Sequence, residues 1–229
     1  MLDRDNTQAK TIAALFKARD YKGIIQFCRS EHQHEQRYWV RRELLGYEYM
    51  ATAQFQDYAR MERLLWKMIR LDILYQRLHD VCNYIELGEL LLLRQKKRQA
   101  LNVLSLGLDL AVKEKEMVLS VLLVIYTHRL ESLESKQLSR YKKAFYQVLE
   151  DWDITLPDNM PTINLESITY ARKAEGHIYC AFQRLYSEVI LLRKENKTKE
   201  ADALITAFVQ EHPTPHLKHL VARIPKSLE

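Results

Sequence analysis

Glycine and proline are scarce in this chain. Its 229 residues contain five of each, and the first proline is Pro157. Sheet proteins need turns at short intervals, and turns draw heavily on glycine and proline. The composition therefore excludes a β-sandwich, a β-barrel and a doubly wound sheet. Scarce glycine also argues against a phosphate-cradling loop, and the sequence contains no Walker or G-x-G-x-x-G string.

The net charge is small and cysteines are few. The 35 basic and 30 acidic residues give a formal net charge of +5, which is small for a dedicated nucleic-acid-binding protein. Cys28, Cys82 and Cys180 are too widely spaced for a disulfide framework or a metal motif, and we expect small buried hydrophobic side chains. The sequence shows no signal-peptide pattern and no apolar run long enough to cross a membrane. We therefore expect a cytoplasmic protein without a membrane partner.

Apolar residues, in contrast, are abundant and recur at three- and four-residue spacing. They make up 47% of the chain, which is enough to bury a core and excludes disorder. The spacing is typical of amphipathic helices, and the short connections predict antiparallel neighbours in an all-α protein. The expected helices are 7–19, 21–31, 36–54, 57–71, 74–94, 97–113, 116–132, 136–151, 167–195, 198–211 and 215–223.

One connection differs from the others. Residues 155–162 read TLPDNMPT and combine two prolines with Asp and Asn, which favours a loop or hinge. Asn164 and Ser167 are the candidates for the cap of the long helix that follows. The expected organisation is helix pairs over 1–154, a proline-containing loop over 155–166, and a last helix pair with a C-terminal cap over 167–229.

The segment 84–112 contains a pattern that recurs elsewhere in the chain. Small residues opposite bulky ones let two helices approach closely. Its first expected helix carries Tyr84, Leu87, Gly88 and Leu91, and its second carries Ala100, Leu104 and Gly107. A looser match near the end has Val189 in the small position and consists of Leu185, Leu192, Ala201, Ile205, Phe208 and Pro213. The remaining helix pairs match less well. They keep the turns and the helical periodicity of the pattern but lose most of its small residues.

These offsets resemble the tetratricopeptide repeat, a unit of about 34 residues that folds into two antiparallel helices. The resemblance extends, with degenerate units, over nearly the whole chain. It implies a right-handed α–α superhelix, a solenoid of about five antiparallel helix pairs followed by a C-terminal capping helix. A generic helical bundle that meets the loose pattern by chance is the alternative.

The resemblance also implies a binding groove, because the first helices of tetratricopeptide units commonly line a concave surface for a peptide or partner helix. We therefore expect a protein–protein interaction scaffold: an adaptor, a chaperone or a regulator. Packing against a neighbouring helix is the alternative role for Ile85 and Leu92. The groove positions carried over from the repeat are Val40, Glu43, Tyr47, Met50, Ala51, Ile85, Glu89, Leu92, Tyr186 and Ile190.

Three turns of the expected helix pairs are basic. If the pairs stack regularly, these turns form a stripe that attracts nucleic acid or an acidic protein. An ordinary solvated turn is the alternative, with basic side chains near helix C-termini. Nucleic-acid-associated regulation is the second functional hypothesis, and self-association through exposed solenoid ends is a third possibility. The basic-edge residues are Arg94, Lys96, Lys97, Arg98, Arg140, Lys142, Lys143, Arg193, Lys194 and Lys197.

No cluster of residues indicates catalysis or metal binding. Residues 31–35 read EHQHE, but His-x-His places two ligands on opposite sides of a helix, and a polar connection explains the segment better. His216 and His219 share a helix face without a carboxylate or cysteine to complete a site. The sequence has no G-x-S-x-G or H-E-x-x-H motif. We therefore expect no enzyme, no cofactor and no metal.

Overall fold

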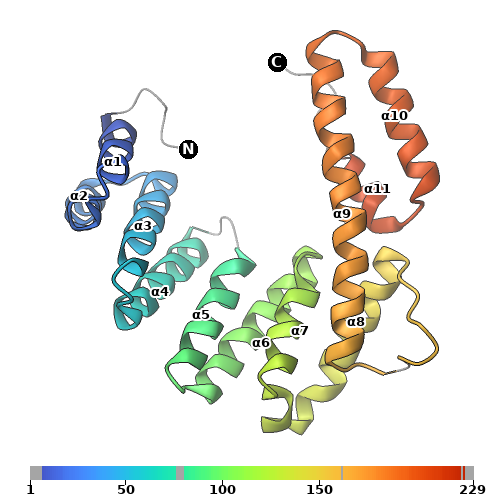
Figure 1. Ribbon diagram of the computed structural model, residues 1–229, viewed down its shortest axis with the longest axis horizontal. Helices are drawn as coiled ribbons and strands as arrows, with labels where there is room; N and C mark the ends of the chain where they lie inside the picture. Colours follow the sequence, from blue (N-terminus) through green and yellow to red (C-terminus); the bar gives the residue numbers. More distant parts are fainter. Residues whose placement is uncertain (1–6, 76–79, 161, 223, 225–229) are drawn as a thin grey trace. The chain divides into compact units, whose positions relative to one another are not determined.

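The computed structural model describes residues 7–75, 80–160, 162–222 and 224, apart from the side chains of Pro215 and His219. Within these ranges the chain forms eleven α-helices and two short 3-10 helices, and no strand. The prediction of an all-helical protein is confirmed. The chain divides into two compact units, Met1–Leu110 and Ala111–Glu229, and Figure 1 gives the order of the helices in each.

In the N-terminal unit, helices that follow one another along the chain also contact one another. Asp20, Asp57 and Asp80 precede three of these helices, and each carboxylate accepts a hydrogen bond from a backbone amide of the first turn. Such caps satisfy amides that have no partner inside the helix. The unit contains α1 (Thr7–Lys17), α2 (Tyr21–His34), α3 (Tyr38–Ala53), α4 (Tyr58–Leu74), α5 (Val81–Leu93) and most of α6 (Lys97–Glu114).

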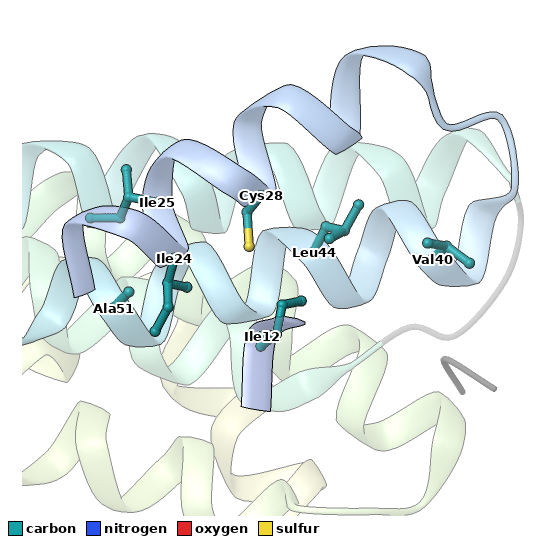
Figure 2. Packing of buried hydrophobic residues seen from close by; sticks show 7 residues of the cluster. All are labelled: Ile12, Ile24, Ile25, Cys28, Val40, Leu44 and Ala51. Carbon is teal, nitrogen blue, oxygen red and sulfur yellow. The ribbon is translucent and has the colours of Figure 1, made fainter. Parts of the chain in front are cut away.

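An apolar cluster joins the first three helices. Its side chains come from α1, α2 and α3, and Ile12, Cys28 and Leu44, one from each helix, lie near one another (Figure 2). Burying an aliphatic side chain of this size stabilises a fold by about 1.5–3 kcal/mol, so the cluster holds these helices together. Its members are Ile12, Ile24, Ile25, Cys28, Val40, Leu44 and Ala51.

Two buried carboxylates also join helices of the N-terminal unit. Glu48 of α3 accepts hydrogen bonds from Arg29 Nε of α2 at 3.1 Å and from Arg60 Nη2 of α4 at 2.6 Å. Asp72 of α4 accepts one from Arg42 Nε of α3 at 3.0 Å. A buried carboxylate that lost its cationic partner would be strongly destabilising, so these pairs fix how α2, α3 and α4 align.

Helices α5 and α6 cross closely at two glycines. A Cβ atom added to Gly88 would lie 2.7 Å from Leu104 Cγ, and one added to Gly107 would lie 2.7 Å from Tyr84 Cβ. Side-chain atoms essentially never approach so closely, so only glycine allows this crossing. We expected Gly88 to face Ala100; Ala100 is buried, but the atoms nearest Gly88 belong to Leu104.

The C-terminal unit is organised around its longest helix, α9, which contacts α7, α8 and α10. Helix α11 in turn contacts α8 and α10. The Asn164 cap is confirmed: its side chain accepts from the Ser167 amide at 2.8 Å, and the Asn164 amide donates to Ser167 Oγ at 2.9 Å. The elements are α7 (Val118–Thr127), η1 (Leu130–Leu133), η2 (Ser135–Gln137), α8 (Leu138–Trp152), α9 (Leu165–Lys194), α10 (Thr198–Glu211) and α11 (Pro215–Ala222).

Several helices end on a left-handed residue that is not glycine. After α1, α5 and α9 this residue is Arg19, Gln95 or Asn196, with φ of 55°, 60° and 61°. The next amide then donates to the carbonyl five residues earlier, which is the Schellman arrangement. These bonds run from Asp20 to Leu15, from Lys96 to Leu91 and from Lys197 to Leu192. The pairs α1–α2, α5–α6 and α9–α10 therefore share one type of turn.

The structure differs from the sequence-based expectation in several further places. The segment 31–35, expected to be a polar connection, is mostly helical: α2 continues to His34, and the Glu35 amide donates to the Glu31 carbonyl at 3.0 Å. The helix expected over 116–132 ends at Thr127, because Arg129 is left-handed (φ 53°) and a 3-10 helix follows. The helix expected over 74–94 is α5, which begins at Val81; residues 76–79 lie outside the described residues. Of the three cysteines expected to be buried, Cys28 is buried, Cys82 is half-buried and Cys180 is exposed.

Among the described residues, no helix combines the length and the apolar character needed to cross a bilayer.

Candidate functional site

Three residues of the expected groove are closed to a partner in this structure. Val40 is 5% exposed, Ala51 0% and Leu92 8%. Val40 and Ala51 belong to the apolar cluster of α1, α2 and α3. Side chains that are already packed inside the protein offer no surface for binding, so the groove prediction is corrected at these three positions.

Tyr47 has a mixed environment. It is half-buried against the apolar cluster, and its ring centroid lies 6.0 Å from that of Phe16. Its hydroxyl donates a hydrogen bond to Glu43 Oε1 at 3.2 Å. Tyr47 therefore contributes to packing as well as to the surface. Of the other groove residues of this unit, Met50 and Glu89 are exposed, and Glu43 and Ile85 are half-buried like Tyr47.

The two remaining groove residues lie on α9 in the C-terminal unit. Tyr186 is exposed, with its ring centroid 6.4 Å from that of Phe182, and Ile190 is half-buried. Tyr186 and Phe182 line a small hollow of about 200 Å³. That volume is below the range of 300–1,000 Å³ typical of ligand sites, so the hollow alone is a weak candidate.

Four residues of the expected basic edge are held in ion pairs. The pairs are Arg94 with Glu62, Lys96 with Glu62 at 3.0 Å, Arg193 with Asp202 at 3.2 Å, and Lys197 with Glu195 at 2.8 Å. These acids offset much of the charge that the sequence suggests. Of the others, Lys97, Arg98, Lys142, Lys143 and Lys194 are exposed, and Arg140 is half-buried with Nη1 3.4 Å from Gln137 Oε1.

The C-terminal unit has a pocket of about 620 Å³, a volume within the usual range for ligand sites. Its walls come from the α6–α7 connection, the start of α7, the end of α8, the first half of α9 and α11. We call it the α9 pocket. Its apolar lining comes from Met117, Leu123, Trp152, Tyr179 and Leu220. A second hollow, of about 670 Å³, lies between α9 and α10 and has no basic side chain in its lining.

Gly176 keeps one wall of the α9 pocket open. It lies inside α9, where glycine costs roughly 1 kcal/mol relative to alanine. A Cβ atom added to it would meet nothing within 4 Å. Trp152, which also lines the pocket, is only 4% exposed, and its ring centroid lies 4.4 Å from that of His216. This ring contact fixes α11 against α8 and so shapes the pocket.

A carboxyl group and several cations surround this apolar lining. Burial raises the pKa of Glu175 from its usual 4.5 to about 7, and the positive charge of Arg172 opposes that shift only in part. Arg172 and Lys173 are exposed, and Lys115 Nζ lies 3.7 Å from Asp151 Oδ1. Near pH 7 the pocket therefore combines a partly protonated acid, Glu175, with three basic side chains and one exposed carboxylate, Glu116.

Sequence reasoning did not single out the α9 pocket. Its lining residues lie in segments as far apart as 115–123 and 216–220, and no local motif connects them. The one feature of the sequence that points to this region is Gly176, a glycine inside the expected helix 167–195. A glycine inside a helix is unusual because it weakens the helix, but its presence does not distinguish a tight helix crossing from an open pocket.

Comparison of the chain with protein-family models, with curated proteins and with solved structures gives no match. In the part of the chain that the structure describes, no group of three His, Cys, Asp or Glu side chains has a metal-binding arrangement.

Proposed function

We propose that this chain is a non-enzymatic interaction protein that binds a peptide segment in the α9 pocket. The observation that supports this proposal is the pocket itself, which has a volume of about 620 Å³, an apolar lining and charged groups around it. Ligand sites usually combine apolar walls with a few polar groups that orient the ligand. A few residues of an extended or helical peptide fit this description.

The proposal includes a tetratricopeptide-like architecture, a superhelix of antiparallel helix pairs. Two observations support it. The same left-handed turn recurs in α1–α2, α5–α6 and α9–α10, and Gly88 and Gly107 allow the close crossing of α5 and α6. Proteins of this architecture bind other proteins along their helix surfaces, which agrees with a binding role.

The nucleic-acid hypothesis has less support. Acidic neighbours offset Arg94, Lys96, Arg193 and Lys197, and phosphate binding depends on cations that are available at the surface. A peptide partner requires no such stripe. The charges therefore favour a peptide partner over nucleic acid.

Equilibrium dialysis against N-acetylated apolar pentapeptides tests this proposal. Half of the peptide pool ends in a carboxylate and half in an amide, and mass spectrometry measures what the protein retains. Gly176→Leu places a side chain in the pocket without meeting other atoms near its Cβ. Gly46→Leu is the matched control, because Gly46 also lies in a helix and also has nothing within 4 Å of an added Cβ.

We expect the wild-type protein and Gly46→Leu to retain peptides from the pool and Gly176→Leu to lose them. Equal retention by Gly176→Leu would place binding outside the α9 pocket. No retention by the wild-type protein would overturn peptide binding.

A further inference from the structure

We infer that the ligand of the α9 pocket is anionic: an apolar chain that ends in a carboxylate. The apolar part lies against Trp152, Leu123 and Leu220, and the carboxylate binds Arg172 and Lys173. This inference rests on the proposed binding role of the pocket and adds the chemistry of the ligand.

The charges around the pocket favour an anion. Arg172 and Lys173 are exposed and line the pocket, and the positive charge of Arg172 also acts on Glu175. Lys115 is a third cation, partly offset by Asp151 at 3.7 Å, and Glu116 is the opposing exposed carboxylate. Arginine binds a carboxylate through two parallel hydrogen bonds, which adds direction to the attraction.

The effect of Glu175 on ligand binding depends on whether its carboxyl group is protonated. When protonated, its carboxyl group can donate a hydrogen bond to the ligand carboxylate, whereas the ionised form repels it. Because burial raises the pKa of Glu175 to about 7, the protonated form is well populated below neutral pH. Ligand binding then favours proton uptake at Glu175.

Because proton uptake at Glu175 accompanies ligand binding, the affinity for the ligand depends on pH. Affinity is greatest below pH 7 and falls as Glu175 ionises, by about tenfold between pH 6 and pH 8. A histidine ordinarily titrates in the same range, so Glu175→Gln is needed to assign the effect. The other charged or titratable side chains at the pocket are Lys115, Glu116, Arg172, Lys173, Tyr179 and His216.

The first experiment compares the two halves of the pentapeptide pool by equilibrium dialysis at pH 6. We expect the free acids to bind at least tenfold more tightly than the amides. Arg172→Glu with Lys173→Glu should abolish this preference. The matched control is Lys142→Glu with Lys143→Glu, an exposed adjacent pair on α8 that does not line the pocket, and it should keep the preference.

The second experiment repeats the dialysis at pH 6, 7 and 8 with Glu175→Gln. Glutamine keeps a hydrogen-bond donor and cannot ionise, so the variant should bind the free acids at pH 6 and lose the tenfold decline toward pH 8. Circular dichroism at each pH checks that both proteins remain folded. A decline that persists in Glu175→Gln would overturn the role of Glu175.

Sodium decanoate, an acyl carboxylate without peptide bonds, serves as the third probe. If the protein binds decanoate but no peptide, the carboxylate inference stands and the peptide proposal fails. If acids and amides bind equally, the peptide proposal stands and the carboxylate inference is overturned. Failure of all three probes to bind would overturn both.

Discussion

Gly88 and Gly176 both lie inside helices, but their surroundings are opposite. A Cβ on Gly88 would lie 2.7 Å from Leu104 Cγ, whereas a Cβ on Gly176 would meet nothing within 4 Å. In the N-terminal unit glycine permits a close crossing of α5 and α6, and in the C-terminal unit it leaves a pocket open. A helical glycine can therefore allow a close helix crossing, as at Gly88, or leave the wall of a pocket open, as at Gly176.

Gly88→Leu should have the largest effect on stability. Its side chain must enter a crossing that has no room for a single added carbon, and we expect a loss of about 3 kcal/mol in the free energy of unfolding. Urea denaturation followed by circular dichroism measures this loss. Combining the change with Leu104→Ala should recover part of it, and unchanged stability would show that α5 and α6 do not cross at Gly88.

Glu175→Gln should have the next largest effect, and the effect should depend on pH. The pKa of Glu175 is about 7 in the native state against its usual 4.5. Between these values the native state keeps a proton that the unfolded state has lost, so wild-type stability falls as pH rises from about 4.5 to 7.

Glutamine removes this ionisation. We therefore expect Glu175→Gln to exceed the wild type in stability by about 1–3 kcal/mol at pH 8, with a smaller difference at pH 5. Thermal melts at the two pH values measure it. The same stability difference at both pH values would contradict the burial of this carboxyl group.

Gly176→Leu should have the smallest effect on stability, and its sign should be opposite to that of Gly88→Leu. Leucine favours a helix over glycine by roughly 0.5–1 kcal/mol, and the added side chain has space. Gly46→Leu should gain a similar amount. Urea denaturation compares the two, and a clear loss confined to Gly176→Leu would mean that the pocket is closed in solution.

The helices themselves were largely predictable because their apolar spacing is local in the sequence. The cap at Asn164 followed from the same kind of local reasoning. The turns were harder, since the left-handed positions hold Arg19, Gln95 and Arg129 rather than glycine. Scarce glycine had removed the usual signal for the end of a helix, and the early end of α7 was missed for this reason.

The candidate site was less predictable than the helices. Positions carried over from the repeat indicated a helix face but not its burial, and Val40, Ala51 and Leu92 are packed inside. The α9 pocket depends on the way α7, α8, α9 and α11 come together. That arrangement is a property of tertiary packing, and no spacing along the chain specifies it.

Fluorescence of Trp152 tests most directly whether the α9 pocket is the binding site. The chain has three tryptophans, and Trp39→Phe with Trp66→Phe leaves only Trp152, which lines the pocket. We predict that the free-acid peptides change its emission in a saturable way, and that adding Gly176→Leu abolishes the change. Peptides that dialysis shows to be bound, without any change in Trp152 emission, would contradict binding in the α9 pocket.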